Sequence, residues 1–338
     1  MEESVTTAVM GAGSWGTTYA GVIADAGFPV TVWARSEEAA RELREEHTNS
    51  KYLPGIRFND RITATSDPVE ALRDAEVVVL AVPAQSLRDN LQQWKDCIRP
   101  DAIIVSLMKG IELDTGLRMS EVIAEVTGFD DKQIAVVSGP NLAREIAEHQ
   151  PTATVVACTC PENAEEIARR SANSYFRPYT NSDVVGVELG GAVKNVIALA
   201  VGIADGQGLG DNSKASIITR GLAEITRLAL VMGAQAHTMA GLAGMGDLVA
   251  TCASPLSRNR SFGRLMGEGL SVDEAAAKTK QTAEGVKSAP AVLGLGAAHD
   301  VDLPITQAVS AVIDGRLHVD DVAGLLLARK RKDESQSN

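Results

Sequence analysis

The 338-residue sequence contains few cysteines, and they form neither a disulfide framework nor a recognisable metal site. A small secreted protein held together by disulfides would carry many cysteines at short spacing. Cys158 and Cys160 lie close together, but no histidine or further cysteine nearby completes a set of metal ligands. The four cysteines are Cys97, Cys158, Cys160 and Cys252. We therefore expect reduced thiols and no bound metal.

Long hydrophobic runs and a secretion signal are also missing. The longest apolar runs, such as Val77–Ala84 and Val196–Ala204, are far shorter than the roughly 18–20 residues that a membrane span requires. The first ten residues, MEESVTTAVM, have neither the basic nor the apolar region of a signal peptide. These observations predict a cytoplasmic protein without a membrane span.

The sequence has no excess of positive charge. It contains 44 acidic and 32 basic residues, which gives a net charge of −12. Such a surface does not favour binding to nucleic acid or anionic membranes, although it is compatible with a local basic pocket. The hydrophobic fraction of 45% and the charged fraction of 22% are typical of a globular protein, and the length suits two domains.

The first half of the chain alternates short runs rich in Val and Ile with helical segments. Each run is too short for a helix and is followed by Gly, Pro or Ser, as buried strands often are. The predicted strands are Thr7–Met10, Val30–Trp33, Val77–Val82, Ile103–Ser106, Ile134–Ser138 and Ala153–Ala157; predicted helices include Glu37–Glu46, Ser86–Trp94 and Leu117–Val126, and His47–Asp60 is predicted to be a loop. This alternation predicts an α/β fold with a mostly parallel sheet covered on both faces.

The second half of the chain has helical patterns and no predicted strand. One apolar stripe recurs at helical spacing through Ile218, Leu222, Ile225 and Ala229. The predicted helices are Val184–Ala204, Ser213–Met232, Ser261–Met266, Val272–Lys280, Ala289–Ala298, Pro304–Ile313 and Val319–Ala328, and a charged tail, Arg329–Asn338, follows them. We therefore expect an all-α second domain.

A glycine-rich motif directly follows the first predicted strand. Gly11, Gly13 and Gly16 occupy the glycine positions of a GxGxxG motif that opens a helix, with Ser14 and Trp15 inside it. The first glycine permits a tight turn, the second lets the backbone approach a pyrophosphate, and the third lets the helix pack on the strand. Amide groups at the start of the helix then face the phosphates. The motif predicts a dinucleotide-binding site.

The residues after the second predicted strand indicate which dinucleotide binds. An NAD-specific site carries Asp or Glu about 20 residues beyond the motif, where the carboxylate binds the 2′-hydroxyl of the ribose. Here the corresponding residues are Arg35 and Ser36, which can bind a 2′-phosphate that a carboxylate would repel. This favours NADPH, whereas the adjacent Glu37 and Glu38 leave NADH as an alternative.

Two lysines are candidates for the proton transfer that accompanies hydride transfer, whereas the five histidines form no recognisable constellation. Lys109 follows the strand Ile103–Ser106, at the carboxyl end where open α/β sheets bind ligands. Lys194 lies in an otherwise apolar helix. Burial of a lysine is costly unless the residue is paired or functional, and it lowers the pKa toward values useful for acid–base catalysis. Gly190 and Gly191 cost helix stability, which close approach of a ligand would explain.

Several motifs occur in an order that identifies a family. They are GAGSWGT from Gly11, SLMKGIE at Ser106–Glu112, SGPNLA at Ser138–Ala143, the segment Gly191–Gly206, GLAGMGDL at Gly241–Leu248 and SRNR at Ser257–Arg260. With them the chain resembles the bacterial NAD(P)-dependent glycerol-3-phosphate dehydrogenases over roughly residues 6–328. The stretch around Lys194 is the most specific of these segments.

The resemblance implies a reaction and a set of site residues. Such enzymes interconvert dihydroxyacetone phosphate and sn-glycerol 3-phosphate by hydride transfer with NAD(P)H, and supply glycerol 3-phosphate for phospholipid synthesis. Lys194 matches the catalytic lysine, which protonates the carbonyl oxygen and takes the proton back in the reverse direction. The matched substrate positions are Lys109, Gly139, Asn141, Lys194, Asp247, Ser257, Arg258 and Asn259. Besides the motif residues and Arg35 and Ser36, the matched cofactor positions are Lys109, Ala143, Arg258 and Glu284. Many relatives carry Ser or Thr in place of Asn141, so this chain departs from the family at that side chain.

The segment Ser257–Arg260 favours a phosphate ligand independently of the resemblance. It precedes a helix predicted to begin near Ser261, whose amides and dipole attract an anion, and arginine offers a rigid fork that suits phosphate. Dehydrogenases of the same architecture, the ketopantoate reductases and β-hydroxyacid dehydrogenases, would instead bind a carboxylate. A non-catalytic NADPH sensor would have no need of Lys194 in an apolar helix.

These observations together predict a two-domain oxidoreductase. We expect a Rossmann-type dinucleotide-binding domain over residues 1–184 and an all-helical substrate and catalytic domain over residues 185–338, with the active site in the cleft between them. The sequence leaves open whether the protein is a homodimer.

Overall fold

A computed structural model describes residues 6–279 and 283–322, and the chain divides into two compact units. Unit 1 comprises Met1–Lys109 and Arg118–Val184, and unit 2 comprises Gly110–Leu117 and Val185–Asn338. The short segment Gly110–Leu117 packs with the helical unit because Ile111, which is fully buried, belongs to the hydrophobic core of that unit. The sequence predicted one boundary at residue 184 and did not predict that Gly110–Leu117 belongs to the helical unit.

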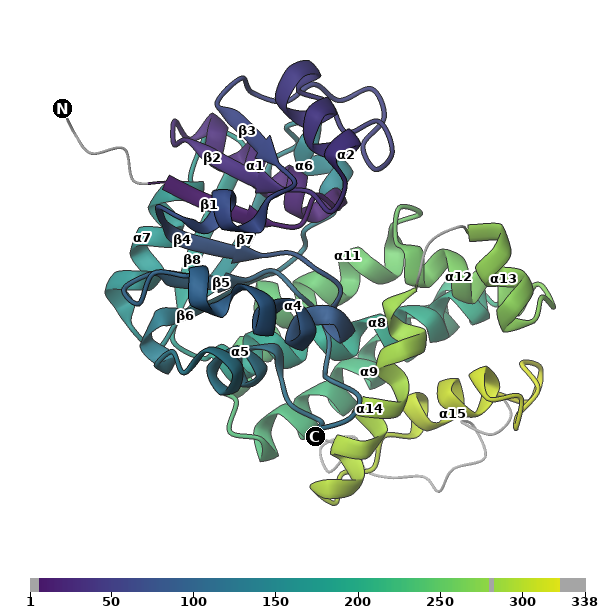
Figure 1. Ribbon diagram of the computed structural model, residues 1–338. Coiled ribbons are helices and arrows are strands. Elements are labelled where there is room, and N and C mark those ends of the chain that lie inside the picture. Colours follow the sequence, from purple (N-terminus) through teal and green to yellow (C-terminus); the bar gives the residue numbers. More distant parts are fainter. Residues whose placement is uncertain (1–5, 280–282, 323–338) are drawn as a thin grey trace. The chain divides into compact units, whose positions relative to one another are not determined.

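Unit 1 contains an eight-stranded sheet in the order β3-β2-β1-β4-β5-β6-β7-β8 (Figure 1). The strands are β1 (Thr6–Met10), β2 (Val30–Trp33), β3 (Ile62–Thr65), β4 (Ala75–Leu80), β5 (Ile103–Ser106), β6 (Ile134–Ser138), β7 (Thr152–Ala157) and β8 (Phe176–Asn181). Neighbouring strands are parallel except β6 and β7, which are antiparallel. The predicted Rossmann-type fold class is confirmed, since the first six strands have the order of a dinucleotide-binding sheet.

The two strands at the edges of the sheet, β3 and β8, were not predicted. A central strand is buried on both faces and has a continuous apolar sequence, as Val77–Leu80 of β4 does. β8 has the sequence FRPYTN, in which only Phe176 is buried. Because an edge strand such as β8 can be partly exposed and tolerates proline, its sequence lacks the pattern that reveals a central strand. β3 has the sequence ITAT, in which two threonines interrupt the apolar run.

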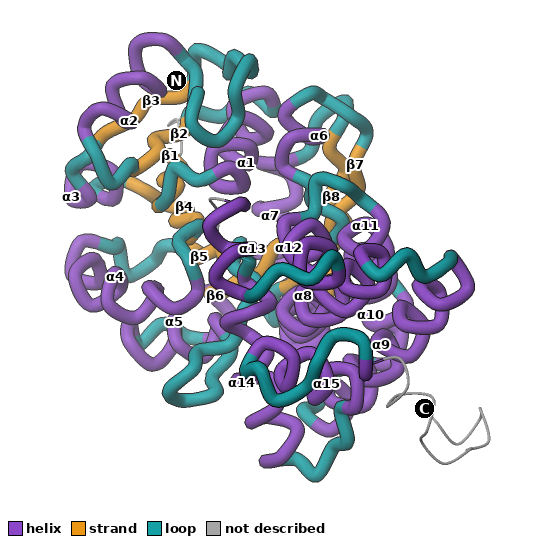
Figure 2. Tube along the Cα trace, turned by 90° about the vertical axis from the view of Figure 1, so that its right-hand side faces the viewer, coloured by secondary structure: helices purple, strands orange, loops and turns teal. Residues whose placement is uncertain are grey.

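The helices of unit 1 pack on the sheet in two groups (Figure 2). They are α1 (Ser14–Asp25), α2 (Glu37–Arg41), α3 (Pro68–Leu72), α4 (Leu87–Trp94), α5 (Met119–Thr127), α6 (Ala143–Ala147) and α7 (Pro161–Ser171). α1 contacts α6 and α7, whereas α4 contacts α5. The chain moves outward from β1 to β2 and in the opposite direction from β4 to β5, so right-handed crossovers place α1 and α4 on opposite faces.

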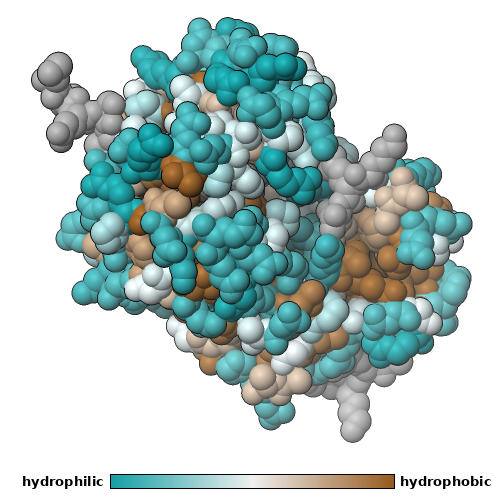
Figure 3. Space-filling model, viewed as in Figure 1, coloured by the Kyte–Doolittle hydropathy of each residue, from teal (hydrophilic) through white to brown (hydrophobic). Residues whose placement is uncertain are grey.

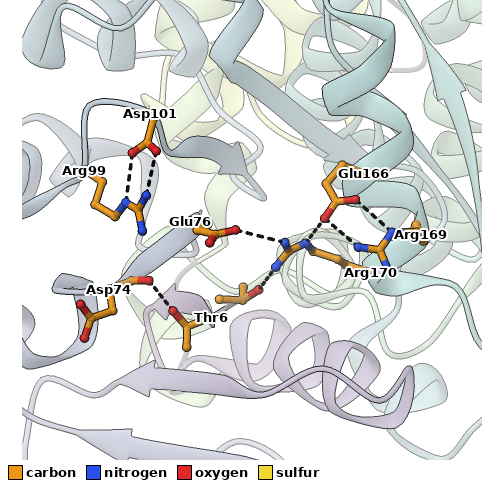
Figure 4. A network of polar contacts seen from close by, with 9 residues as sticks. Thr6, Asp74, Glu76, Arg99, Asp101, Glu166, Arg169 and Arg170 are labelled. Atoms are coloured by element: carbon orange, nitrogen blue, oxygen red, sulfur yellow. Dashed lines mark hydrogen bonds and ion pairs between the residues drawn. The ribbon is translucent and has the colours of Figure 1, made fainter. Parts of the chain in front are cut away.

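A buried arginine ties helix α7 to the amino-terminal ends of the central strands (Figure 4). The side chain of Arg170 lies 2.6 Å from Glu166, 3.4 Å from the hydroxyl of Thr7 in β1 and 3.7 Å from Glu76 in β4. Nearby, the Thr6 hydroxyl donates to the carbonyl oxygen of Asp74. Ligands of such sheets bind at the carboxyl ends of the strands, so we assign this network to stability.

Unit 2 is helical, and none of its residues that the structure describes forms a strand. Its helices are α8 (Val184–Gly206, which begins at the last residue of unit 1), α9 (Asp211–Val231), α10 (Ala236–Ala240), a π-helix (Leu242–Gly246), α11 (Asp247–Ala253), α12 (Arg258–Gly267), α13 (Val272–Thr279), α14 (Glu284–Ala298) and α15 (Pro304–Ile313). The helix predicted over Val319–Ala328 lies outside the described residues from position 323 onward, as does the charged tail. Apolar residues gather on the surface of this unit between α13 and α15 (Figure 3).

Helix α8 forms the centre of unit 2. Its mean hydropathy over 18 residues is 1.7, which together with its 23 residues would suffice to cross a membrane. The sequence analysis missed this because it counted only uninterrupted apolar runs, and Lys194 interrupts them. However, 89% of the apolar window is buried inside the protein, as expected of a core helix.

Helices α8 and α12 pack with their backbones in contact. A Cβ atom built on Gly202 would lie 2.1 Å from the carbonyl oxygen of Arg260, and one on Gly263 would lie 2.2 Å from that of Leu199. Any larger side chain at these positions would force the helices apart. The glycines therefore fix the start of α12 against the last turns of α8.

A buried glutamate in unit 2 gives a test of pH-dependent stability. Glu224 of α9 is 1% exposed and accepts hydrogen bonds from the backbone amides of Ile305 and Thr306 at the start of α15. Burial raises the pKa of Glu224 to about 7, although these donors oppose the shift. The folded protein then holds the proton more tightly than the unfolded chain, whose carboxyl has a pKa near 4.5. Its stabilising effect is complete below pH 4.5 and is lost as the pH rises through 7.

We therefore expect Glu224→Gln, which keeps an acceptor oxygen but cannot ionise, to remove this dependence. Relative to the variant, the wild type should lose up to about 3 kcal/mol of unfolding free energy between pH 4.5 and 7.5. Denaturant titrations of both proteins across this range measure the difference. A difference that does not change with pH would contradict the assignment.

Candidate functional site

The glycine-rich turn lies where β1 ends and α1 begins. Gly11 has φ +136°, and a Cβ atom there would lie 2.5 Å from the carbonyl oxygen of Ala81. A Cβ atom on Gly16 would lie 2.1 Å from the carbonyl oxygen of Gly11. Both positions therefore require glycine, because Gly11 packs against the backbone that follows β4 and Gly16 packs against the backbone of Gly11.

The same turn suits a pyrophosphate. A Cβ atom built on Gly13 would meet nothing within 4 Å, so there is open space beside the backbone at this position. Gly13 is also the N-cap of α1 and provides no side chain to satisfy the first amides of the helix. Within the described residues, the buried indole nitrogen of Trp15 has no hydrogen-bond partner. Free amides, open space and an unpaired donor are the features that a bound dinucleotide phosphate would use, so the residues fit this group.

Sequence analysis missed a residue that braces this turn. Asn49 is 6% exposed and donates from Nδ2 to the carbonyl oxygen of Ala12 and to the hydroxyl of Thr17. It lies in the predicted loop His47–Asp60, where nothing in the local pattern distinguishes it from a surface residue. Only the fold brings it beneath the glycine-rich turn.

Arg35 follows β2 and is available to bind a ligand, whereas Ser36 caps a helix. Arg35 is exposed, and it forms no hydrogen bond or ion pair with any described residue. Ser36 accepts from the amide of Ala39 at 3.3 Å and begins α2. Glu37 pairs with Arg44 at 3.0 Å and accepts from Ser66 at 2.7 Å. Its carboxylate is therefore engaged, which weakens the objection that it would repel a 2′-phosphate.

Lys109 and the SGPN segment meet at the carboxyl ends of β5 and β6. Lys109 Nζ donates to the carbonyl oxygen of Gly139 at 3.0 Å. Gly139 has φ +147°, and a Cβ atom there would lie 3.2 Å from Thr154, so the position favours glycine. Asn141 Nδ2 donates to the hydroxyl of Thr154 at 3.0 Å, whereas its Oδ1 is buried with no partner among the described residues. Ala143 begins α6, and its carbonyl oxygen accepts from Thr18 of α1 at 3.2 Å.

In unit 2, Lys194 belongs to a buried polar cluster. Lys194 is 5% exposed and donates to Oδ1 of Asp247, which is 1% exposed. It also donates to the hydroxyl of Thr251 at 2.8 Å, and that hydroxyl lies 3.4 Å from Asp247 Oδ1. The buried ammonium is thus paired and held from two sides, which satisfies the requirement that a buried charge have partners. Thr251 was not identified from the sequence, although it follows Asp247 by one helical turn.

The approach of Asp247 to Lys194 depends on glycine. A Cβ atom on Gly190 would lie 2.5 Å from the carbonyl oxygen of Ala243, in the π-helix that precedes α11. The explanation of Gly190 by close approach of a ligand is therefore wrong: the backbone of the neighbouring segment fills that space. Asp247 is the first residue of α11 rather than its N-cap, which is Gly246. π-helical turns are frequent at functional sites.

A cysteine lies next to this cluster without taking part in it. Cys252 is 2% exposed, and burial raises the pKa of its thiol to about 12, despite the opposing effect of Lys194. The thiol therefore remains neutral at physiological pH and is not a nucleophile.

The SRNR segment forms the N-cap and first turn of α12. The Ser257 side chain accepts from the backbone amide of Arg260 at 3.2 Å, which makes Ser257 the N-cap. The prediction that the helix begins near Ser261 was wrong, because the capping role of Ser257 was not recognised. Arg258 is exposed and, among the described residues, has no hydrogen bond or ion pair. Its guanidinium and the free amides of the first turn are available to an anion.

Asn259 connects three helices of unit 2. Its Nδ2 donates to Oδ1 of Asn195 at 3.0 Å, and its Oδ1 accepts from the amide of Gly285 at 2.9 Å. Asn195 follows Lys194, and Gly285 follows Glu284 in the first turn of α14. That helix begins five residues before the predicted start at Ala289 and contains Pro290 in its interior. The side chain of Asn259 is thus used to order the site, which its resemblance to a substrate-binding position did not reveal.

The predicted residues fall into one group in each unit. In unit 1, Gly11, Gly13, Ser14, Trp15, Gly16, Arg35, Ser36, Lys109, Gly139, Asn141 and Ala143 all follow the carboxyl ends of strands β1, β2, β5 and β6. In unit 2, Lys194, Asp247, Ser257, Arg258, Asn259 and Glu284 lie in α8 or at the starts of α11, α12 and α14. No cluster of three or more metal-ligating side chains occurs among residues 6–279 and 283–322.

Comparison with known proteins gives the same family over both units. Residues 6–164 match the family described as the NAD-dependent glycerol-3-phosphate dehydrogenase N-terminus, and residues 183–324 match its C-terminus. The chain is 58% identical to a glycerol-3-phosphate dehydrogenase [NAD(P)+] of Thermobifida fusca over 328 residues, which is 97% of this chain and 98% of that protein.

Solved structures distinguish this family from its architectural relatives. A glycerol-3-phosphate dehydrogenase crystal structure from Coxiella burnetii superimposes with a TM-score of 0.92 at 36% identity, covering 96% of this chain and 99% of that one. A ketopantoate reductase from Ralstonia eutropha reaches a TM-score of 0.60 at 17% identity, covering 94% and 100%. The second likeness concerns the fold alone.

Proposed function

The chain belongs to the family of NAD-dependent glycerol-3-phosphate dehydrogenases, and we propose that Lys194 is the proton donor and Arg258 the phosphate ligand in its reaction. The protein is an NAD(P)-dependent oxidoreductase that interconverts dihydroxyacetone phosphate and sn-glycerol 3-phosphate. The observation that carries the assignment of roles is the buried cluster of Lys194, Asp247 and Thr251.

Lys194 has the chemistry that reduction of a ketone requires. NAD(P)H supplies the hydride, and the developing alkoxide then needs a proton. Lys194 Nζ holds protons that it can donate, and Asp247 and Thr251 restrict where that ammonium points. In the reverse direction the neutral amine accepts the proton of the alcohol. Asp247 favours the return of the amine to its charged form because the carboxylate is buried beside it.

The remaining predicted residues are proposed to bind substrate or cofactor. We assign substrate contacts to Lys109, Gly139, Asn141, Lys194, Asp247, Ser257, Arg258 and Asn259, and cofactor contacts to Gly11, Gly13, Ser14, Trp15, Gly16, Arg35, Ser36, Lys109, Ala143, Arg258 and Glu284. The unpaired guanidinium of Arg258, the open space at Gly13 and the unpaired indole nitrogen of Trp15 support these roles among the described residues. Residues 1–184 would then bind the dinucleotide, and residues 185–338 would supply the proton and bind phosphate.

A direct assay tests the reaction. NADPH oxidation should be rapid with dihydroxyacetone phosphate and undetectable with ketopantoate, because the arginine at the start of α12 suits a phosphate dianion. A non-catalytic NADPH sensor would oxidise the cofactor with neither substrate. Turnover with ketopantoate at a comparable rate would contradict the assignment.

Preference for NADPH is expected to depend on Arg35. Arg35→Asp removes an attractive charge and adds a repulsive one, so the dissociation constant of NADPH should rise on the order of 100-fold, while that of NADH changes by a few-fold. Titration of both cofactors by their fluorescence measures the two constants. Arg41→Asp, an equal change of charge on the exposed part of α2, is the matched control. If Arg35→Asp raises the dissociation constants of NADPH and NADH equally, Arg35 does not discriminate between the cofactors, and Ser36 or the backbone must do so.

We also propose that the enzyme acts in the cytoplasm as a homodimer. The cytoplasmic assignment is supported by four unpaired cysteines, all of them within the described residues, and by the burial of α8 inside unit 2. The homodimer is supported by apolar side chains that unit 2 exposes, among them Val231 at 53% and Val249 at 45%. Sedimentation equilibrium across micromolar concentrations should give twice the mass of one chain, and a monomer throughout would refute the dimer.

A further inference from the structure

The second arginine of the SRNR segment is engaged within the protein. Arg260 lies in the first turn of α12, and its guanidinium is 2.8 Å from Oδ2 of Asp205 in the last turn of α8. The two side chains are 17% and 20% exposed. A pair this sheltered is screened less by water and salt than a surface pair. Arg260 is therefore held by α8.

Asp205 has a second cationic partner. Lys214 of α9 lies 3.3 Å from Asp205 Oδ1 and 2.9 Å from Asp211. Asp205 thus joins the start of α12 to both α8 and α9. Because Lys214 remains beside it, loss of Arg260 would not leave the carboxylate without a cation.

The backbones of α8 and α12 are also in contact at Arg260. The carbonyl oxygen of Arg260 is the atom that a Cβ on Gly202 would meet at 2.1 Å. Gly202 lies one turn before Asp205, so both the backbone and the side chain of Arg260 are attached to one stretch of α8. The first turn of α12 consequently has little freedom to shift along α8.

Arg258 lies two residues before Arg260 in this turn. Its guanidinium is exposed and makes no hydrogen bond or ion pair with the described residues, in contrast to that of Arg260. Of the two arginines, one is attached to the protein and the other is free to bind a ligand.

We propose that Arg260 is a positioning residue: its ion pair with Asp205 fixes the first turn of α12 so that Arg258 and the adjacent amides are preorganised for the substrate phosphate. This inference rests on the proposed role of Arg258. Misplacement of a binding group by about 1 Å can cost on the order of 100-fold in rate, so a residue that holds the turn affects catalysis without touching substrate.

Removal of Asp205 distinguishes positioning from direct electrostatic attraction, because the two hypotheses predict opposite effects on phosphate binding. If Arg260 only contributed positive charge, removal of the negative Asp205 would strengthen binding of a phosphate dianion. If Arg260 positions the turn, removal of Asp205 releases it and weakens binding. Asp205→Asn is therefore the decisive variant.

We expect Asp205→Asn and Arg260→Met each to lower kcat/KM for dihydroxyacetone phosphate by roughly 10- to 100-fold, mainly through KM, because the binding site is less ordered. The rate with phosphate-free dihydroxyacetone should change less than about two-fold, since it does not use the phosphate site. The double variant should lose little more than either single variant, because both remove the same ion pair. Arg260→Lys keeps the charge and should restore part of the loss.

Arg264→Met is the matched control. Arg264 lies one turn further along α12 and pairs at 2.8 Å with Glu268, the C-cap of that helix, so loss of its side chain affects the helix but not the ion pair with α8. It should leave both substrates unaffected. A loss equal to that of Arg260→Met would show general weakening of α12 and would overturn the proposal. An unchanged or lower KM in Asp205→Asn would also overturn it.

Arg258→Ala separates failure of this proposal from failure of the proposed function. Arg258→Ala could selectively lower kcat/KM for the phosphorylated substrate while Asp205→Asn has no effect. This result would support the phosphate site and contradict only the positioning role of Arg260. If Arg258→Ala impairs both substrates equally, both proposals fall. Should Asp205→Asn not fold, Arg260→Lys decides the question, because Lys214 still pairs with Asp205 in this variant. Complete recovery relative to Arg260→Met would indicate direct attraction by charge and overturn the proposal, whereas partial recovery supports positioning by the guanidinium pair.

Discussion

Replacement of Lys194 by methionine is expected to lower kcat by roughly 10²- to 10⁴-fold, the usual contribution of acid–base catalysis, while the enzyme still binds NADPH. The methionine side chain has a similar length but no proton to donate to the developing alkoxide. Lys194 donates to Asp247 and Thr251 of unit 2, whereas the predicted glycine-rich turn belongs to unit 1, so we expect cofactor affinity to change little. Single-turnover kinetics and a fluorescence titration measure the two quantities separately.

The stability of the Lys194→Met protein must be measured as well. Removing the ammonium leaves Asp247, which is 1% exposed, without its cation, and breaking a buried ion pair costs about 3–5 kcal/mol. Thr251→Val is the matched control, because it removes the hydroxyl contact to Nζ but keeps the charge pair. We expect this variant to lose less activity than Lys194→Met, by roughly 10- to 100-fold, because a hydrogen bond that involves a charged group is worth about 1.5–3 kcal/mol. Turnover retained in Lys194→Met would exclude Lys194 as the proton donor.

The central part of the fold could be predicted from the sequence, and the edges could not. Strands such as Ile103–Ser106 and Ile134–Ser138 were predicted with the bounds that the structure has, because burial on both faces requires an uninterrupted apolar run. β3 and β8 lie at the edges, so β8 can include Arg177 and Pro178, which hide it from a search for apolar runs. β3 is buried at Ile62, Ala64 and Thr65, but the two threonines in its sequence ITAT interrupt the apolar run.

Within the site, the sequence identified charged residues but not the residues that hold them in place. Lys194 could be found because a charge in an apolar helix is unusual, whereas Thr251 is an ordinary helical residue until the fold brings it within 2.8 Å of the lysine. Gly190 was noticed but misinterpreted, since the sequence cannot show whether a ligand or the backbone of Ala243 occupies the space beside it. Long-range contacts of this kind depend on helix packing, which no local window contains.

The SRNR segment illustrates the same limit at the phosphate site. The sequence predicted a loop before the helix, but Ser257 caps α12 and places Arg258 and Asn259 in the first turn. Three of the four side chains then bind within the protein: Ser257 accepts from an amide, Asn259 connects α8 and α14, and Arg260 pairs with Asp205. The motif therefore contains one exposed arginine and three residues that order it.

Arg258→Ala is consequently expected to lower kcat/KM for dihydroxyacetone phosphate by about 30- to several-thousand-fold. A phosphate dianion bound by a guanidinium forms charge-assisted hydrogen bonds, and loss of one partner of such a pair costs on the order of 2–5 kcal/mol. At roughly 1.4 kcal/mol per ten-fold change in rate, this energy gives the stated range. Phosphate-free dihydroxyacetone, already a poor substrate, should respond far less because it cannot form the contact.

A contribution of Arg258 to cofactor binding must be separated from its role at the phosphate. The resemblance assigns this residue to both ligands, so the dissociation constant of NADPH is measured for the variant and rates are compared at saturating cofactor. Arg258→Lys provides a second comparison: it keeps the charge but loses the planar fork, and should recover only part of the rate with the phosphorylated substrate. If Arg258→Ala then reduces the rates of both substrates by one common factor, the guanidinium does not bind the phosphate, and the anion must instead be held by the amides at the start of α12.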